Sequence, residues 1–153
     1  MGWFESIRKY TWNETTTPYF VPVQKLNRTQ AGKELFVYTL FLLILFGVLA
    51  LVSCGGKSNE GDFFSIVVSA HAFTVFCAAL LLGVRKSPAA ALYCVSAPVA
   101  SFVFALVTKL QLGRGSLADY VFLGFTVLWF FYSRRVYAIA KAYAGLPEMD
   151  RTP

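Results

Sequence analysis

Three long stretches without a charged residue restrict the fold of this chain more than any other feature. Each stretch contains 22 residues, and they cover 35–56, 63–84 and 87–108. An α-helix rises about 1.5 Å per residue, so about 20 residues cross a hydrocarbon core of about 30 Å. The composition agrees, because 14% of the 153 residues are charged, whereas soluble domains carry roughly 25%. The sequence therefore predicts an all-α integral membrane protein.

A fourth uncharged stretch, 120–133, is shorter than the other three. Ser116 and Asp119 fit a capping box, in which side chains satisfy the first free backbone N–H groups of a helix. A helix that begins at Leu117 is long enough to span, and we expect it to continue to about Ala144. The predicted fold is a bundle of four transmembrane helices with spans at about 35–55, 63–84, 88–108 and 117–133. Three spans and a surface helix are the alternative.

The N-terminal part of the chain has a different character. Aromatic residues at helical spacing within 2–12 predict a short interfacial helix, and two prolines within 15–23 predict an extended strap. We therefore divide the chain into an interfacial helix and extended arm (1–26), a membrane domain (27–144) and a C-terminal tail (145–153). Asn27 and Gln30 indicate that the first helix begins before the bilayer.

The distribution of lysine and arginine predicts the topology. Of 14 such residues, 11 lie in the N-terminal segment, the turn at 85–86 and the C-terminal segment. The opposite loops contain only Lys57, Lys109 and Arg114. By the positive-inside rule both termini lie on the cytoplasmic side. We expect a multi-pass protein of the bacterial inner membrane or an equivalent energy-transducing or organelle membrane.

Small residues at four-residue spacing predict how two of the spans pack. They let helix backbones approach closely in lipid, and we expect the small faces of the second and third spans to meet. Pro98 removes one backbone hydrogen bond and should kink the third span. The two small faces consist of Ala70, Thr74 and Ala78 in the second span and of Ala97, Ser101 and Ala105 in the third.

His71 is the only histidine and lies near the centre of its span. Ionisable side chains at that depth are costly and need a partner. Thr74 lies one turn away on the same helix, and Ser101 and Thr126 lie at a similar level on other helices. Together with His71 these residues form a candidate interhelical polar site. A neutral imidazole bonded to Ser101 or Thr126, a proton relay or ligand site, and metal or haem ligation all stay open. One histidine without nearby carboxylates cannot hold a metal alone, so we predict no metal and no cofactor.

Basic residues at the cytoplasmic rim form the second candidate site. They could contact an anion or a lipid head group, and Glu34 lies at the same rim. The candidate residues are Arg85, Lys86, Arg134 and Arg135.

The sequence contains no catalytic signature. It has no nucleophile elbow, no Gly-rich phosphate loop and no cluster of histidine and carboxylates. We therefore expect a non-catalytic accessory or structural subunit of a larger membrane complex, which contributes helix packing and a cytoplasmic docking arm. Its predicted partners are the lipid bilayer and other membrane protein subunits. No nucleic acid is expected, and a homo-oligomer is possible. A small oligomeric membrane enzyme or lipid- or anion-binding bundle, and a self-associating channel around His71, are the alternatives.

Overall fold

The computed structural model describes residues 21–55, 63–112 and 116–148, in which every regular element is a helix. The predicted interfacial helix and most of the predicted strap fall outside these residues. The elements in chain order are η2 (Val23–Lys25), α2 (Arg28–Gly55), α3 (Phe63–Arg85), α4 (Pro88–Cys94), α5 (Ser96–Leu112), α6 (Leu117–Ala142) and η3 (Tyr143–Gly145).

Three segments of the described chain are long and apolar enough to cross a membrane. They are Arg28–Val52 in α2, Ile66–Arg85 in α3 and Pro88–Val107, which runs through α4 and α5. These segments correspond to the three uncharged stretches of the sequence. The all-α prediction is confirmed, and the three candidate spans indicate a multi-pass membrane protein in contact with the lipid bilayer.

Two helices begin at capping residues that were predicted from the sequence. At the start of α6, the Ser116 hydroxyl accepts from the Asp119 N–H, while Asp119 Oδ2 accepts from the Ser116 N–H at 2.7 Å. At the start of α2, Asn27 Oδ1 accepts from the Gln30 N–H at 2.8 Å, and Gln30 Oε1 accepts from the Asn27 N–H at 3.2 Å. Both predicted N-terminal caps are confirmed. Each satisfies two backbone donors that the helix itself leaves free.

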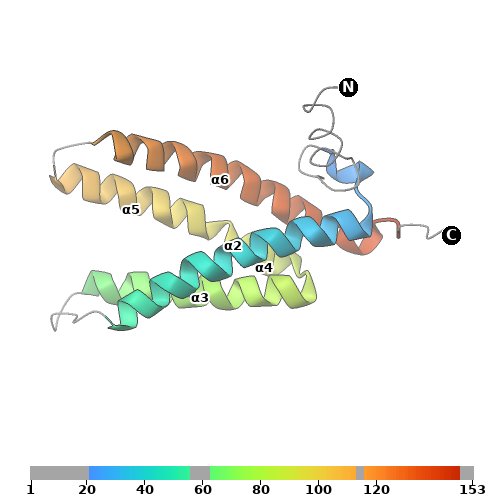
Figure 1. Cartoon of the computed structure of the whole chain (residues 1–153), viewed down its shortest axis with the longest axis horizontal. Helices are drawn as coiled ribbons and strands as arrows, with labels where there is room; N and C mark the ends of the chain where they lie inside the picture. Colours follow the sequence, from blue (N-terminus) through green and yellow to red (C-terminus); the bar gives the residue numbers. More distant parts are fainter. Residues whose placement is uncertain (1–20, 56–62, 113–115, 149–153) are drawn as a thin grey trace, which may run out of the picture.

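The helices form two antiparallel pairs that meet at one end (Figure 1). α2 packs along α3, and α5 packs along α6, while α4 contacts both α3 and α6. The pairs meet where α2 begins and α6 ends, which we call the closed end. They diverge toward the C-terminal ends of α2 and α5, which we call the open end.

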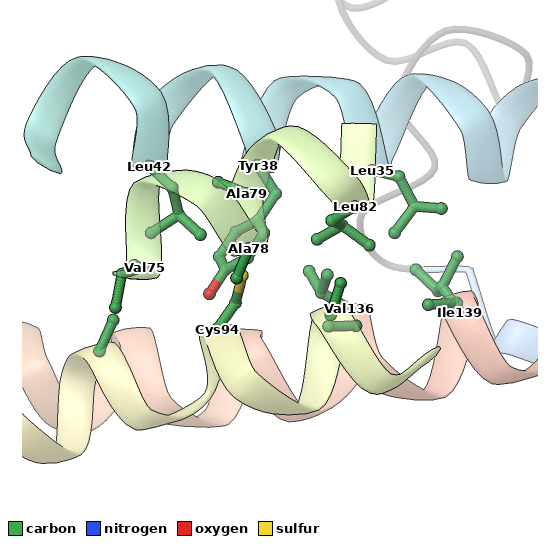
Figure 2. Close-up of a cluster of buried hydrophobic side chains, with 14 of the residues drawn as sticks. Leu35, Tyr38, Leu42, Val75, Ala78, Ala79, Leu82, Cys94, Val136 and Ile139 are labelled. Carbon is green, nitrogen blue, oxygen red and sulfur yellow. The ribbon is translucent and has the colours of Figure 1, made fainter. Parts of the chain in front are cut away.

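The buried core occupies the closed end and the middle of the bundle, and among the residues whose burial is described it stops short of the open end. On α2 the buried side chains Leu35, Tyr38, Leu42 and Phe46 follow helical spacing, and none is buried from 47 to 52. Figure 2 shows part of this cluster, with side chains of α2, α3, α4 and α6 directed toward one another. The core on the other helices includes Ala72, Val75, Ala79 and Leu82 of α3, Ala91 and Cys94 of α4, Ala97 of α5, and Trp129, Val136 and Ile139 of α6.

Gly83 brings α3 close to α2. A Cβ atom at this position would lie 2.9 Å from Thr39 Cγ2, which is closer than real Cβ contacts allow. At Gly124 in α6, by contrast, such a Cβ would have no atom within 4 Å apart from the adjoining backbone of its own helix. The absence of a side chain at Gly83 therefore permits the tight α2–α3 contact that small residues provide in membrane bundles.

The predicted contact between the small faces of the second and third spans is wrong toward the open end. The helix is interrupted at Val95, between α4 and α5. Pro98 has no N–H to donate to the carbonyl four residues earlier, which accounts for a break at this place. α3 packs on α4, whereas α5 packs mainly on α6. As a result Ala70 and Thr74 are exposed on α3.

Candidate functional site

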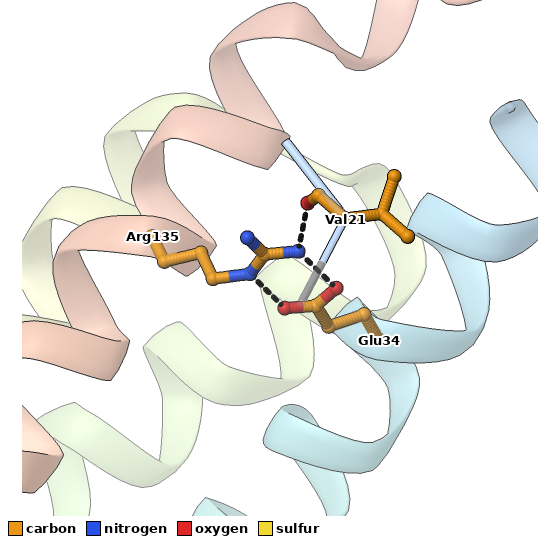
Figure 3. Close-up of polar contacts among 3 residues, drawn as sticks. All are labelled: Val21, Glu34 and Arg135. Atoms are coloured by element: carbon orange, nitrogen blue, oxygen red, sulfur yellow. Dashed lines mark hydrogen bonds and ion pairs between the residues drawn. The ribbon is translucent and has the colours of Figure 1, made fainter. Parts of the chain in front are cut away.

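The principal polar contact of the closed end is an ion pair between α2 and α6 (Figure 3). Arg135 Nε donates to Glu34 Oε1 at 2.7 Å, and Arg135 Nη2 donates to Glu34 Oε2 at 3.2 Å. Nη2 also donates to the carbonyl of Val21 at 2.8 Å. The Glu34 side chain is 0% exposed and that of Arg135 is 21% exposed. This bidentate geometry joins α2, α6 and the segment that precedes η2.

A second polar contact lies one helical turn farther from the closed end. The Tyr38 hydroxyl and Ser133 Oγ are 2.8 Å apart, and both residues are buried. Ser133 Oγ donates its proton to the Trp129 carbonyl at 2.8 Å. The Tyr38 hydroxyl is therefore the donor in the hydrogen bond between Tyr38 and Ser133. Together with the ion pair, this chain fixes the register of α2 against α6.

The other three predicted rim residues are placed differently from Arg135. Arg85 and Arg134 are exposed. Lys86 has φ of 52° and donates from Nζ to the Gly83 carbonyl at 2.6 Å, at the C-terminus of α3. Desolvation by partial burial lowers the pKa of Lys86 from its ordinary value. Arg135 is thus engaged inside the chain, whereas Arg85 and Arg134 face outward.

Two carboxylates of the closed end are already paired. Glu34 pairs with Arg135, and Glu148 lies 2.7 Å from Arg28, whose guanidinium also stacks over Tyr143. Six further cations there have no carboxylate within ion-pair distance in the described part of the chain. These six are Lys25, Lys33, Arg85, Lys86, Arg134 and Lys141.

The residues of the predicted polar site around His71 make local contacts. Thr74 Oγ1 donates to the His71 carbonyl at 2.9 Å and accepts from the Tyr93 hydroxyl at 2.8 Å. Thr126 Oγ1 donates to the Leu123 carbonyl of its own helix at 2.8 Å. Both threonines therefore satisfy their hydroxyl groups without bonding the imidazole.

The imidazole itself lies against a ring of α2. His71 and Phe46 meet edge to face, with ring centroids 6.4 Å apart. His71 Nε2 is buried and has no hydrogen-bond partner among the described residues, and the half-buried Ser101 makes no hydrogen bond with them. An unpartnered polar atom in an apolar setting is costly.

An aromatic cluster around Trp129 lies where the two helix pairs begin to diverge. Its ring lies 5.4 Å from Phe41 and 6.3 Å from Phe46, both on α2, and 6.1 Å from Phe125 on its own helix. Trp129 is 6% exposed. Sequence reasoning missed this cluster, since the spacing of aromatic residues does not show which of them face another helix.

Within the described ranges no group of three histidine, cysteine or carboxylate side chains could hold a metal ion. No protein-family model, curated protein or solved structure matches this chain. The site must therefore be interpreted from its own chemistry. That chemistry consists of an internal ion pair, a hydrogen-bonded register contact and outward-facing cations.

The pairing of Glu34 with Arg135 was not predicted from the sequence, although both residues were assigned to the cytoplasmic rim. They are 101 positions apart, so no local spacing connects them. Opposite charges at matched depth on two antiparallel helices were the available signal, because lipid makes an unpaired charge there costly.

Proposed function

We propose that this chain is a non-catalytic helical subunit of a larger integral membrane complex, and that its open end receives a transmembrane helix of a partner subunit. The observation that carries the proposal is that the buried core stops short of the open end, among the residues whose burial is described. Beyond that core, each helix continues at the same spacing into residues that no other part of the described chain covers fully.

These residues form what we call the open-end stripe. Leu49 follows Leu42 and Phe46 on α2 at helical spacing, and it is 37% exposed. The stripe is in this way continuous with the core of the closed end. Its full set is Leu49 on α2, Val68 on α3, Ser101 and Ala105 on α5, and Phe122 on α6.

The chemistry of the stripe favours a protein helix over lipid as its occupant. Ser101 and Ala105 are small, and small residues let a second backbone approach closely. Lipid tails cannot accept or donate hydrogen bonds, whereas a helix can supply a partner for the half-buried Ser101 hydroxyl.

The proposal includes α6 as a fourth span, with both ends of the chain and the closed end on the cytoplasmic side. It is supported by the 26-residue length of α6 and by the cations gathered at the closed end. In a variant without native cysteines, we expect a membrane-impermeant maleimide to label Leu117→Cys from outside intact cells. Glu148→Cys should react only after permeabilisation. Labelling of both from one side would contradict a fourth span.

Photo-crosslinking tests the occupant of the open-end stripe. We expect p-benzoylphenylalanine at Leu49 to form a discrete adduct with another integral membrane protein, because that side chain continues the packing face of α2. Mass spectrometry should place the crosslinked peptide within a transmembrane segment of the partner.

The matched control is Leu51, two residues away on the opposite face of α2 and 75% exposed. The same photoreactive residue there should crosslink to lipid. The proposal fails if Leu49 also gives only lipid adducts while the protein, extracted in mild detergent, has the native mass of a lone chain.

A further inference from the structure

One exposed face of α6 carries three polar side chains close to the cytoplasmic end. Arg134, Tyr137 and Lys141 are spaced by three and four residues, so they lie on one side of the helix. It borders the buried side of α6, since Tyr137 follows the buried Ser133 by four residues and its ring packs against the core. Arg134 and Lys141 are exposed, and Tyr137 is half-buried.

The polar groups of these three side chains have no hydrogen-bond or ion-pair partner within the described chain, although the Tyr137 ring packs against the core. Arg134 and Lys141 have no ion-pair or hydrogen-bond partner there, and neither has the Tyr137 hydroxyl. Arg135, the neighbour of Arg134, is by contrast fully engaged with Glu34. Two cations and one phenol hydroxyl therefore present hydrogen-bond donors on one face, with no acceptor in the part of the chain that the structure describes.

The same face is apolar toward the open end. Val127, Phe130 and Phe131 precede Arg134 at helical spacing; Val127 and Phe131 are exposed, and Phe130 is half-buried. Phe130 and Phe131 contact each other edge to face, with ring centroids 6.0 Å apart. The face thus has donors for a phosphate at one end and an apolar surface for acyl chains next to it.

We propose that this face of α6 binds an anionic phospholipid, with the phosphate held by Arg134, Tyr137 and Lys141 and the acyl chains lying on Val127 and Phe131. Charge complementarity supports the assignment, because the closed end presents cations whose nearby carboxylates, Glu34 and Glu148, are already paired. The proposal rests on the proposed membrane position of α6 and does not depend on the partner helix.

Native mass spectrometry of the full chain, titrated in detergent with dioleoylphosphatidylglycerol or dioleoylphosphatidylcholine, tests the site. We expect Arg134→Gln/Lys141→Gln to weaken phosphatidylglycerol binding by about 10-fold or more, because each cation near anionic lipid contributes about fivefold. Tyr137→Phe should cause a smaller loss, of about two- to threefold, through one hydrogen bond. Binding of phosphatidylcholine should change little.

The matched control is Lys25→Gln/Lys33→Gln, which removes the same charge from the same end but from η2 and α2. If both double variants lose phosphatidylglycerol equally, general attraction explains the binding and the site is wrong. If Arg134→Gln/Lys141→Gln binds like the wild type, the proposal is also wrong. Displacement of the lipid by millimolar inorganic phosphate would instead identify a free-phosphate site. Crosslinking from Leu49 should be unchanged in both double variants. The lipid site can therefore be wrong while the partner-helix proposal still holds, and the two failures are distinguishable.

Discussion

Replacing Arg135 with methionine should lower the free energy of unfolding by about 3–5 kcal/mol. The Glu34 side chain is 0% exposed, and Arg135 is the only cation that pairs with it among the described residues. Removing the guanidinium leaves a carboxyl group without its counter-charge between α2 and α6. It also removes the bond to the Val21 carbonyl, which ties the preceding segment to α6. Unfolding by SDS in zwitterionic micelles, followed by circular dichroism, measures the loss.

The adjacent Arg134 provides the control for this prediction. It is exposed and has no ion-pair partner among the described residues, so Arg134→Met should change the unfolding free energy by less than about 0.5 kcal/mol. The double variant Glu34→Leu/Arg135→Met should recover most of the stability, because it removes both charges together. Equal effects of Arg134→Met and Arg135→Met would show that the ion pair does not hold the helices together.

Trp129→Ala should destabilise the bundle by about 3–5 kcal/mol, the range for removing a large buried aromatic side chain. Trp129 is 6% exposed and packs against Phe41 and Phe46 of α2. It lies where the buried contacts of α2 with α6 end, and the cavity left by its removal would lie between the two helix pairs. The same SDS titration measures the loss.

Phe131→Ala is the matched aromatic control on α6. Phe131 is 60% exposed, so its replacement should cost less than about 0.5 kcal/mol. Trp129→Phe should cost less than Trp129→Ala, since a smaller cavity remains. If Trp129→Ala and Phe131→Ala are equally mild, the aromatic cluster does not join the two helix pairs.

Local signals in the sequence predicted the helices well. The uncharged stretches correspond to the three candidate spans, and the capping pairs Asn27/Gln30 and Ser116/Asp119 form as expected. These predictions succeeded because they depend on short-range physics. A run of apolar residues or a capping side chain has the same consequence wherever the helix lies in the fold.

The faces that the helices present to each other were predicted less well. Ala70 and Thr74 have the spacing of a packing face, yet they are exposed, because the interruption at Val95 separates α5 from α3. Similarly, Arg134 and Arg135 are adjacent and chemically equal in the sequence. Only their positions around α6 decide that one pairs with Glu34 and the other faces outward.

The sequence by itself determined that this chain forms apolar helices of membrane-spanning length, because peptide groups in hydrocarbon must bond within their own helix. It also determined where α2 and α6 begin. The tertiary structure alone decided that the helices close at one end and diverge at the other, and that Glu34 meets Arg135. Such choices depend on side chains more than 100 positions apart that come into contact only when the helices pack, and no local pattern encodes which of the similar apolar faces will meet.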